Sequence, residues 1–224
     1  MVFDWGFAAE ILPELVDALG LSLRVTALSF TLALLLGMVL ALGRRAQSGW
    51  VARPVSWFVE FIRRTPPLVQ IYLLYFAAPA WGLQLSPFWA GSLALGLHYS
   101  CYLAEVYRAG IESIPKGQWE AAQALGMPKG LVYKDVILPQ ALPPVLPAMG
   151  NYLIALFKDT PLLSAITLLE LLQAAKILGA SYFQYLEPLT LVGLLFLVVS
   201  LTSSVGLRLL ERWLPQAGLP MRHR

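Results

Sequence analysis

Two adjacent charged residues, Lys158 and Asp159, lie inside a long apolar stretch and are the side chains best suited to bind a charged molecule without covalent chemistry. A charge inside a membrane span costs roughly 3 kcal/mol on insertion scales, so such residues usually face a partner or a water-filled cavity. They therefore mark a candidate path for a polar solute. The alternative is a structural ion pair, formed with each other or with a charge on another span.

A second polar pair, Thr65 and Gln70, flanks a Pro-Pro break in another apolar stretch. Where proline interrupts a helix, the freed backbone groups can line a cavity, and these side chains are able to hydrogen-bond to a solute there. They are equally able to bond to neighbouring helices. Structural roles are expected for His98, as a buried packing residue, and for Glu105 with Arg108, as an ion pair.

Composition limits the chemistry that the chain can perform. Of its 224 residues, 58% are hydrophobic and 13% are charged. Soluble domains carry roughly 25% charged residues, so lipid is the expected solvent. The single cysteine excludes an internal disulfide, and the two histidines, His98 and His223, are far apart, which argues against a metal site or a cysteine-based enzyme. The chain also lacks a glycine-rich phosphate loop with a lysine, so it is not expected to hydrolyse ATP.

Five stretches with few or no charges predict five membrane-spanning helices, since about 20 apolar residues cross the hydrocarbon layer. They cover residues 19–42, 66–80, 87–107, 144–168 and 189–207. All of the 16 basic residues except Arg24, Lys158 and Lys176 then fall on one side of the membrane. Because basic residues favour the cytoplasmic side, the N-terminus is predicted to lie outside and the C-terminus inside. These basic residues are expected to be membrane anchors, and nucleic-acid binding is not expected.

The segments between the spans carry expectations of their own. Residues 1–18 are expected to form a short lead-in on the outer face, in which Pro13 interrupts any long helix, with no removable signal peptide. Residues 46–64 are expected to form an elbow at the cytoplasmic membrane surface, and residues 169–187 to lie outside. The prolines between 139 and 147 predict that the chain from about residue 136 is not regular helix, and that the helix of the fourth span starts near Pro144.

The stretch from Glu120 to Pro139 lies in the longest polar interruption of the chain. A helix-forming run up to Leu125 is broken by Gly126, since glycine reaches backbone angles that other residues avoid. Pro128 suits the first turn of a second short helix, which ends at Pro139. Two short helices at an angle, between two membrane spans, form a rigid knob on one membrane face. Such a knob is well suited to being gripped by another protein.

This stretch resembles the EAA loop of binding-protein-dependent ABC importers. Glu120-Ala121-Ala122 is followed after three residues by Gly126, and Leu138-Pro139 closes the motif, while Val136 stands where the family has isoleucine. The resemblance implies a coupling helix that docks in a groove on a cytoplasmic ATPase subunit. Glu120 would then pair with an arginine of its own subunit or of the ATPase. The alternatives are a helix-capping role for Glu120 and an ordinary amphipathic hairpin.

Three further motifs narrow the resemblance. They are Glu60–Gln70, similar to E-x-x-R-G-T-P-L-L-V-Q, Tyr102–Ile114, similar to Y-x-A-E-x-x-R-x-G-I-x-S-I, and Lys158-Asp159-Thr160 with Leu162, similar to K-D-T-S-L. Arg64, Pro67 and Pro161 depart from these patterns. Over about residues 20–210, the chain is similar to the membrane subunit of the histidine, glutamine, glutamate, arginine and opine importers.

The resemblance implies a single transmembrane permease domain over residues 1–224, with a coupling loop at about 115–139 and the all-α, type I ABC importer permease fold. Such a subunit is not an enzyme. It lies in a bacterial cytoplasmic membrane and binds no cofactor, since ATP and Mg belong to the partner ATPase.

The implied partners are cytoplasmic ATPase subunits, an extracytoplasmic amino acid-binding protein, a second permease subunit and the lipid bilayer. A polar amino acid offers a carboxylate and an ammonium group, so its expected path includes Thr65, Gln70, Lys158, Asp159 and Thr160. The competing classes are an ATP-independent transporter or channel, which needs no EAA loop, and a membrane-embedded enzyme, which needs a catalytic cluster.

Overall fold

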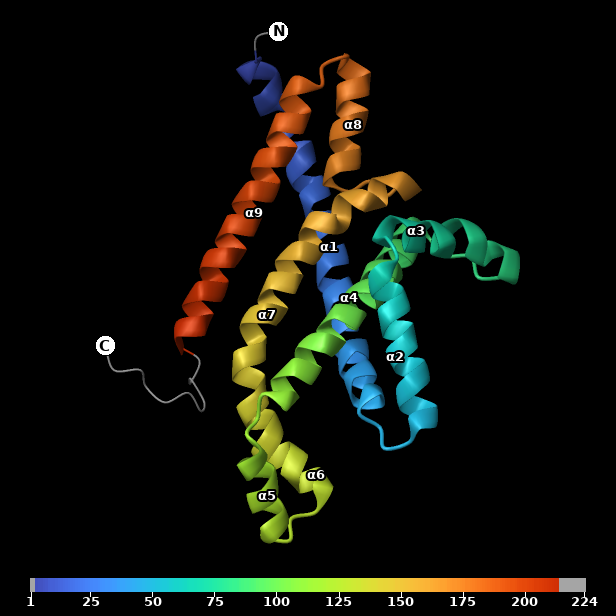
Figure 1. Ribbon diagram of the computed structural model, residues 1–224. Coiled ribbons are helices and arrows are strands. Elements are labelled where there is room, and N and C mark those ends of the chain that lie inside the picture. The colour runs from blue at the N-terminus through green and yellow to red at the C-terminus, as the bar shows by residue number, and fades with distance from the viewer. Residues whose placement is uncertain (1–2, 214–224) are drawn as a thin grey trace.

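The computed structural model describes residues 3–213, and all regular structure in that range is helical (Figure 1). The longer helices are α1 (Trp5–Arg44), α2 (Gly49–Arg64), α4 (Pro87–Glu112), α7 (Leu138–Asp159), α8 (Leu171–Tyr182) and α9 (Leu186–Trp213). The shorter elements are α3 (Pro67–Tyr72), α5 (Lys116–Ala124), α6 (Lys129–Leu131), π-helical segments at Leu73–Ala77 and Val132–Ile137, and 3-10 segments at Ala78–Trp81 and Thr160–Ile166. His223 and two basic residues predicted to lie inside, Arg222 and Arg224, fall outside the described residues.

Two of these helices, α1 and α9, are each long and apolar enough to cross a membrane alone. A third span results if Lys129–Ile166 and Leu171–Tyr182, which meet at a bend of 49°, are taken together. Pro67–Trp81 is a shorter apolar helix. The count of five spans and the direction of the chain across the membrane stay predictions.

Helix α1 is continuous over 40 residues, so the prediction that Pro13 interrupts a long helix is wrong. The helix begins after Asp4, whose carboxylate accepts hydrogen bonds from two backbone N–H groups at 2.8 and 3.1 Å. A proline in a helix interior costs about 3 kcal/mol. Here Phe7, Ile11 and Leu15 are buried on both sides of the proline against α8 and α9, and this packing offsets the cost.

Helix α7 begins at Leu138, before the predicted start near Pro144, and continues through three internal prolines. The prediction that this segment is irregular is therefore also wrong. Ala141 and Val145 on its inner face are buried against the rest of the bundle, which holds this segment in the helical form. The helix ends earlier than predicted, at Asp159, and continues as a 3-10 turn. Thr167 then adopts a left-handed φ of 62°, which turns the chain towards α8.

The core of the bundle is the pair α1 and α4, which pack most extensively against each other. Their backbones approach closely at two glycines. A Cβ added at Gly37 would lie 2.9 Å from the carbonyl oxygen of Ser100, and one at Gly96 would lie 3.0 Å from Cβ of Leu32. Residues 46–64, predicted as an elbow, are mostly helix α2, which packs against both core helices.

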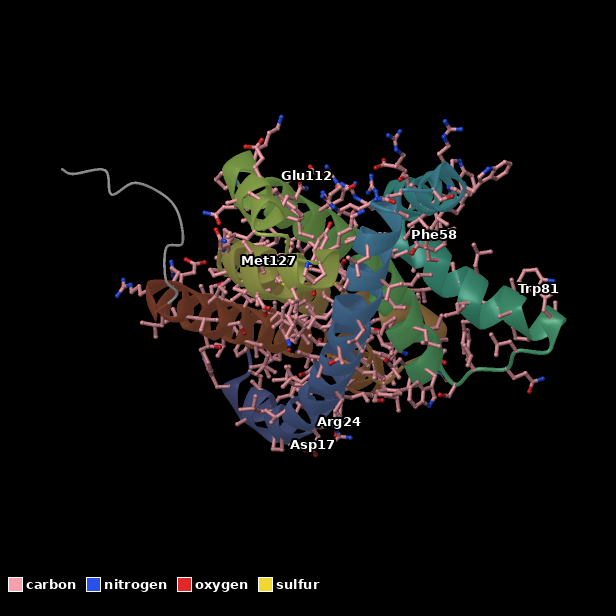
Figure 2. All side chains as sticks on the ribbon, turned by 90° about the horizontal axis from the view of Figure 1, so that it is seen from below. Asp17, Arg24, Phe58, Trp81, Glu112 and Met127 are labelled. Carbon is pink, nitrogen blue, oxygen red and sulfur yellow. The ribbon has the colours of Figure 1, made fainter. Side chains whose placement is uncertain are left out.

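The segment Pro67–Trp81 leaves the bundle as an arm, with Trp81 at its tip (Figures 1 and 2). Phe76 and Trp81 are 61% and 81% exposed. The arm has nearly the bounds of the predicted span at residues 66–80. Its break from α2 falls at Thr65 and Pro66, because proline lacks the N–H group needed to continue a helix.

Candidate functional site

The knob, residues 115–139, is bent at Gly126, whose φ of 68° lies in the left-handed region. Its N–H group donates to the carbonyl of Gln123 at 2.9 Å, and the N–H of Met127 donates to the carbonyl of Ala122 at 3.1 Å, which closes helix α5. A Cβ added at Gly126 would meet no heavy atom within 4 Å. Glycine is therefore required by the backbone angle and not by lack of space. A side chain in this conformation costs roughly 1–2 kcal/mol.

The inner face of the knob is joined to the bundle by a buried apolar cluster. Its members are Ile111, Ile114, Ala122, Val132, Ile137 and Ala141, contributed by the knob and by helices α4 and α7. Trp119 and Tyr133 pack edge to face at 5.3 Å and brace α5 against the π-helical segment. The knob is therefore a rigid extension of α4 and α7.

The outer face of the knob carries the other residues of the predicted motif. Glu120 and Ala121 are exposed, and Leu125 is 79% exposed. The Glu120 carboxylate forms no hydrogen bond or ion pair with any residue from 3 to 213. The N-cap position of α5 is Pro115, so Glu120 does not cap this helix. An open hollow of about 460 Å³ borders the bend, lined by Gln47, Trp119, Gln123, Gly126, Met127, Lys129, Val132 and Tyr133.

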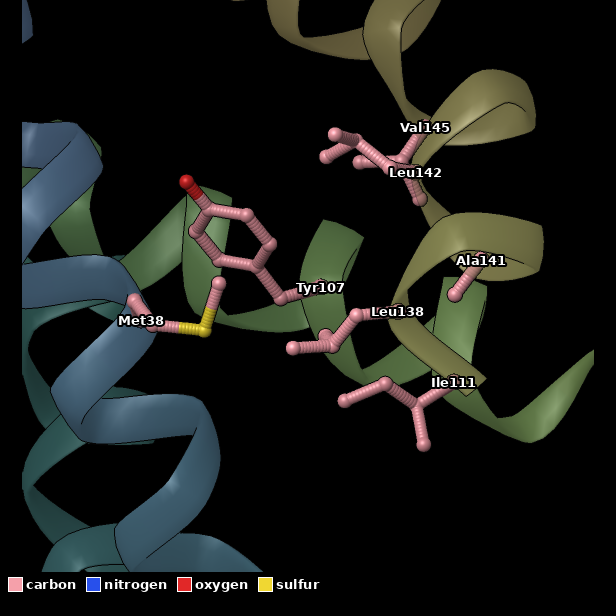
Figure 3. A pocket seen from close by; sticks show the side chains of 7 residues that line it. All are labelled: Met38, Tyr107, Ile111, Leu138, Ala141, Leu142 and Val145. Carbon is pink, nitrogen blue, oxygen red and sulfur yellow. The ribbon is translucent and has the colours of Figure 1, made fainter. Parts of the chain in front are cut away.

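Leu138 and Pro139 are the first residues of α7, which follows the π-helical segment without a break, so the prediction that the second short helix ends at Pro139 is wrong. Leu138 is half-buried and lines a small apolar cavity of about 20 Å³ between α1, α4 and α7 (Figure 3). The other lining residues are Met38, Tyr107, Ile111, Ala141, Leu142 and Val145. The Tyr107 hydroxyl donates to a backbone carbonyl of α1 at 3.3 Å, and the other side chains that line the cavity are apolar. Pro139 itself is exposed.

Thr65 and Gln70, two of the predicted path residues, meet at the break between α2 and α3. The Nε2 group of Gln70 donates to Oγ1 of Thr65 at 2.7 Å and to the carbonyl of Ile62 at 2.9 Å, which closes the end of α2. The Oε1 atom of Gln70 lies 3.3 Å from Nδ1 of the buried His98 on α4. Both side chains thus bond to neighbouring helices. This is the role that the sequence left open for the pair as the alternative to a contact with a solute.

Asp159, at the end of α7, accepts a 2.7 Å hydrogen bond from the Tyr99 hydroxyl of α4. The rings of Tyr99, Tyr102, Tyr152 and His98 cluster there, with centroid separations between 5.2 and 6.3 Å. The sequence reasoning missed the tyrosines, although a spacing of three residues places Tyr99 and Tyr102 on one face of a helix. A carboxylate beside aromatic faces is an arrangement that attracts a cationic group.

Lys158 and Thr160 do not join this cluster. Lys158 is exposed and forms no ion pair with Asp159 or with any other residue in the described range. Thr160 is fully buried, and its hydroxyl donates to the carbonyl of Phe157 at 2.8 Å. Of the five predicted path residues, the structure therefore gathers three beside α4 and leaves these two apart.

Comparison with known proteins decides the family. Residues 33–215, which include the whole knob, match the model of the binding-protein-dependent transport system inner membrane component. The chain belongs to this family. A Sinorhizobium fredii protein named as a probable amino-acid ABC transporter permease is 44% identical over 219 residues, which cover 98% of this chain and 95% of that protein. The arginine transport system permease protein ArtQ of Bacillus subtilis is 36% identical over 217 residues, covering 95% and 97%.

Solved structures agree with this assignment. A crystal structure of an amino acid ABC transporter with histidines has a TM-score of 0.90 at 34% identity, over 96% of this chain and all of that one. The inward-facing methionine transporter MetNI, at 21% identity and a TM-score of 0.70, shares the fold. The predicted all-α membrane fold of the type I ABC permeases is confirmed. The chain is a permease subunit of an amino acid ABC transporter, and such subunits are transport components.

The permease also contains an ion cluster of which the sequence reasoning found only one pair. Glu105 on α4 accepts hydrogen bonds from Arg44 at the end of α1, from Arg63 of α2 at 3.1 Å and from Arg108 of α4 at 2.9 Å. Only the pairing of Glu105 with Arg108, three residues away on the same helix, can be predicted from the spacing in the sequence. The guanidinium of Arg63 also lies over the ring of Tyr102 at 5.2 Å. One carboxylate thus ties three helices together and joins them to the aromatic cluster.

Proposed function

We propose that this permease subunit forms part of the path of an ATP-driven importer for polar amino acids and couples to a cytoplasmic ATPase through the knob. The proposal rests on the difference between the exposed outer face of the knob and its buried inner face. Its outer face presents an exposed carboxylate, Glu120, and an exposed apolar side chain, Leu125, which suits docking of a short helix in a partner's groove. Its inner face shares a buried cluster with α4 and α7, so a displaced knob moves these helices with it.

In the proposed assembly, two permease subunits, alike or different, enclose the path in a bacterial cytoplasmic membrane, with the N-terminus outside and the C-terminus inside. Two ATPase subunits hold ATP and Mg and grip the knobs from the cytoplasm, while a binding protein delivers the amino acid from outside. ATP binding draws the knobs together and opens the path outward, and hydrolysis resets it inward. The names of the relatives, which include an arginine permease, support an amino acid as the solute.

Within this path, Asp159 is the predicted contact with the best structural support. Its carboxylate is half-buried and hydrogen-bonded to Tyr99. One carboxylate oxygen accepts that bond, and the carboxylate retains further acceptor capacity for a substrate ammonium group. Lys158, one residue earlier, is exposed and lies apart from this cluster, so a contact between Lys158 and a substrate carboxylate rests on the sequence motif alone.

Coupling through the knob is tested by replacing Gly126 with valine. A β-branched residue is a strong outlier at a φ of 68°, so Gly126→Val distorts the bend. The permease is reconstituted in liposomes with its ATPase and binding protein, and ATP hydrolysis is measured with and without a panel of amino acids. We expect loaded binding protein to stimulate hydrolysis for the wild-type chain and not for the variant.

Gly117→Val is the matched control. Gly117 lies in the same knob, has ordinary backbone angles, and a Cβ there would meet no heavy atom within 4 Å. It is expected to retain stimulation, and size-exclusion chromatography confirms that both variants assemble. Full stimulation of a correctly assembled Gly126→Val permease would overturn coupling through the knob. Absence of stimulation in the wild type by every amino acid would overturn the proposed solute.

A further inference from the structure

Helix α2 has an inner face that packs and an outer face that does not. Val59 and Ile62 on the inner face are buried in a cluster shared with α4. At 3.6 residues per turn, positions 50, 53, 57, 61 and 64 fall together on the opposite side. Trp50, Trp57 and Phe61 on that side are 92%, 69% and 50% exposed. Large aromatic rings thus cover a helix face that no described part of the chain covers.

Of the two arginines on this outer face, only the one near the start of α2 lacks an ion-pair partner among the described residues. Arg53 lies near the start of α2, at the end of the bundle nearer α5 and α6 (Figure 1), and forms no ion pair within residues 3–213. At the other end, Arg64 is held by Glu60, with Nε and Oε2 3.2 Å apart. The neighbouring Arg63 binds Glu105 in the ion cluster. Arg53 therefore supplies the unpaired cation of this face.

The cation and the rings follow one another along the helix. Beside Arg53 is an open hollow of about 470 Å³. Its lining residues are Gly49, Trp50, Arg53 and Pro54. About one turn further on lies Trp57, and another turn on lies Phe61, with the two rings stacked at 5.5 Å and 14°. The rise of 1.5 Å per residue separates these three side chains by steps of about 6 Å. A cation near the start of α2, followed along the helix by flat apolar rings, matches the order of a lipid phosphate followed by an acyl chain.

We propose that the outer face of α2 binds an anionic phospholipid, with the Arg53 guanidinium on its phosphate and the Trp57 and Phe61 rings along its acyl chain. Membership of an inner membrane component family places a bilayer around the bundle. Amphipathic aromatic rings and basic residues are the side chains that membrane interfaces favour. A basic residue near an anionic lipid surface gains about fivefold in affinity. The inference is independent of the coupling role proposed for the knob.

The test places a photoreactive group where the acyl chain is expected. In the full chain, Trp57 is replaced by p-benzoylphenylalanine, and the protein is reconstituted in vesicles of equal phosphatidylglycerol and phosphatidylcholine. After illumination, mass spectrometry measures the ratio of the two lipid adducts. We expect phosphatidylglycerol adducts to exceed phosphatidylcholine adducts about fivefold, and Arg53→Gln to return the ratio to that of the bulk lipid.

Two controls make the result specific to this face. Arg24→Gln removes an exposed arginine far from α2 (Figure 2), and it is expected to leave the adduct ratio at position 57 unchanged. The same photoreactive group at Leu201, 53% exposed on α9, is expected to report the bulk ratio. A bulk ratio at position 57 in the otherwise wild-type chain, a ratio insensitive to Arg53→Gln, or cross-links to protein in place of lipid would each overturn the proposal.

Discussion

Replacing Gly110 with alanine tests the contact by which α4 and α7 jointly support the knob. A Cβ at Gly110 would overlap Cγ2 of Val145 and would lie 3.1 Å from the carbonyl oxygen of Ala141. Val145 is 5% exposed and β-branched, so its methyl group has little freedom to rotate away. The Ala141 oxygen belongs to the backbone of α7. Relief of the overlap therefore requires the two helices to separate.

The expected loss follows from two opposing effects. Overpacking of a core contact costs about 1–3 kcal/mol. Alanine is favoured over glycine in a helix by up to ~1 kcal/mol, which offsets part of the cost. We expect Gly110→Ala to destabilise the purified chain by about 1–2 kcal/mol, a fall of roughly 2–8 °C in the Tm measured in detergent micelles.

The overlap with Val145 also predicts that the losses of stability in a double variant are not additive. Val145→Ala removes the overlapped methyl group, so the double variant is expected to be about 1 kcal/mol more stable than the two separate losses imply. Gly193→Ala on α9 is the matched control, because a Cβ there would meet no heavy atom within 4 Å. Additive losses in the double variant, or a Gly110→Ala chain as stable as the control, would refute the reasoning.

Two further substitutions test the polar contacts of α4. Glu105→Gln leaves three guanidinium groups without their shared carboxylate, whose side chain is 18% exposed, and is expected to cost about 2–3 kcal/mol. Glu112→Gln, at a side chain 47% exposed, should cost below about 1 kcal/mol in the same thermal unfolding assay, and a larger loss there would contradict this order. Tyr99→Phe removes the hydroxyl that donates to Asp159 and is expected to cost about 1–2 kcal/mol. Tyr152→Phe serves as its control, since that hydroxyl bonds to no residue within 3–213, and equal losses would argue against the hydrogen bond.

The parts of the structure that sequence predicts best depend on local chemistry. Gly126 marks the bend of the knob because a left-handed backbone angle is a property of one residue. The start of α4 at Pro87 agrees with the predicted start of the third span, and this boundary too is marked by one residue, since proline suits the first turn of a helix. The family motifs are also local, and a match over a few residues identifies them without knowledge of the fold.

The failures at proline have a common physical cause. Pro13 and the prolines of α7 carry a local cost that the sequence displays, while the buried contacts that offset it come from other helices. Phe7 and Ile11 beside the first proline pack against α8, more than 150 residues away in the chain. A rule that weighs each segment alone counts the cost and omits the compensation. It therefore breaks helices that tertiary packing holds together.

The polar path shows why adjacency in sequence is a poor guide to a site on a helix. Lys158 and Asp159 read as a pair, but successive residues on a helix project about 100° apart. When Asp159 faces Tyr99 of α4, Lys158 is carried to an exposed side, and the two charges serve different surfaces. Gln70 lies 28 residues from its partner His98, and Asp159 lies 60 residues from Tyr99. Such pairs form where helices pack together, α3 against α4 and α4 against α7, and no single segment of the sequence displays these contacts.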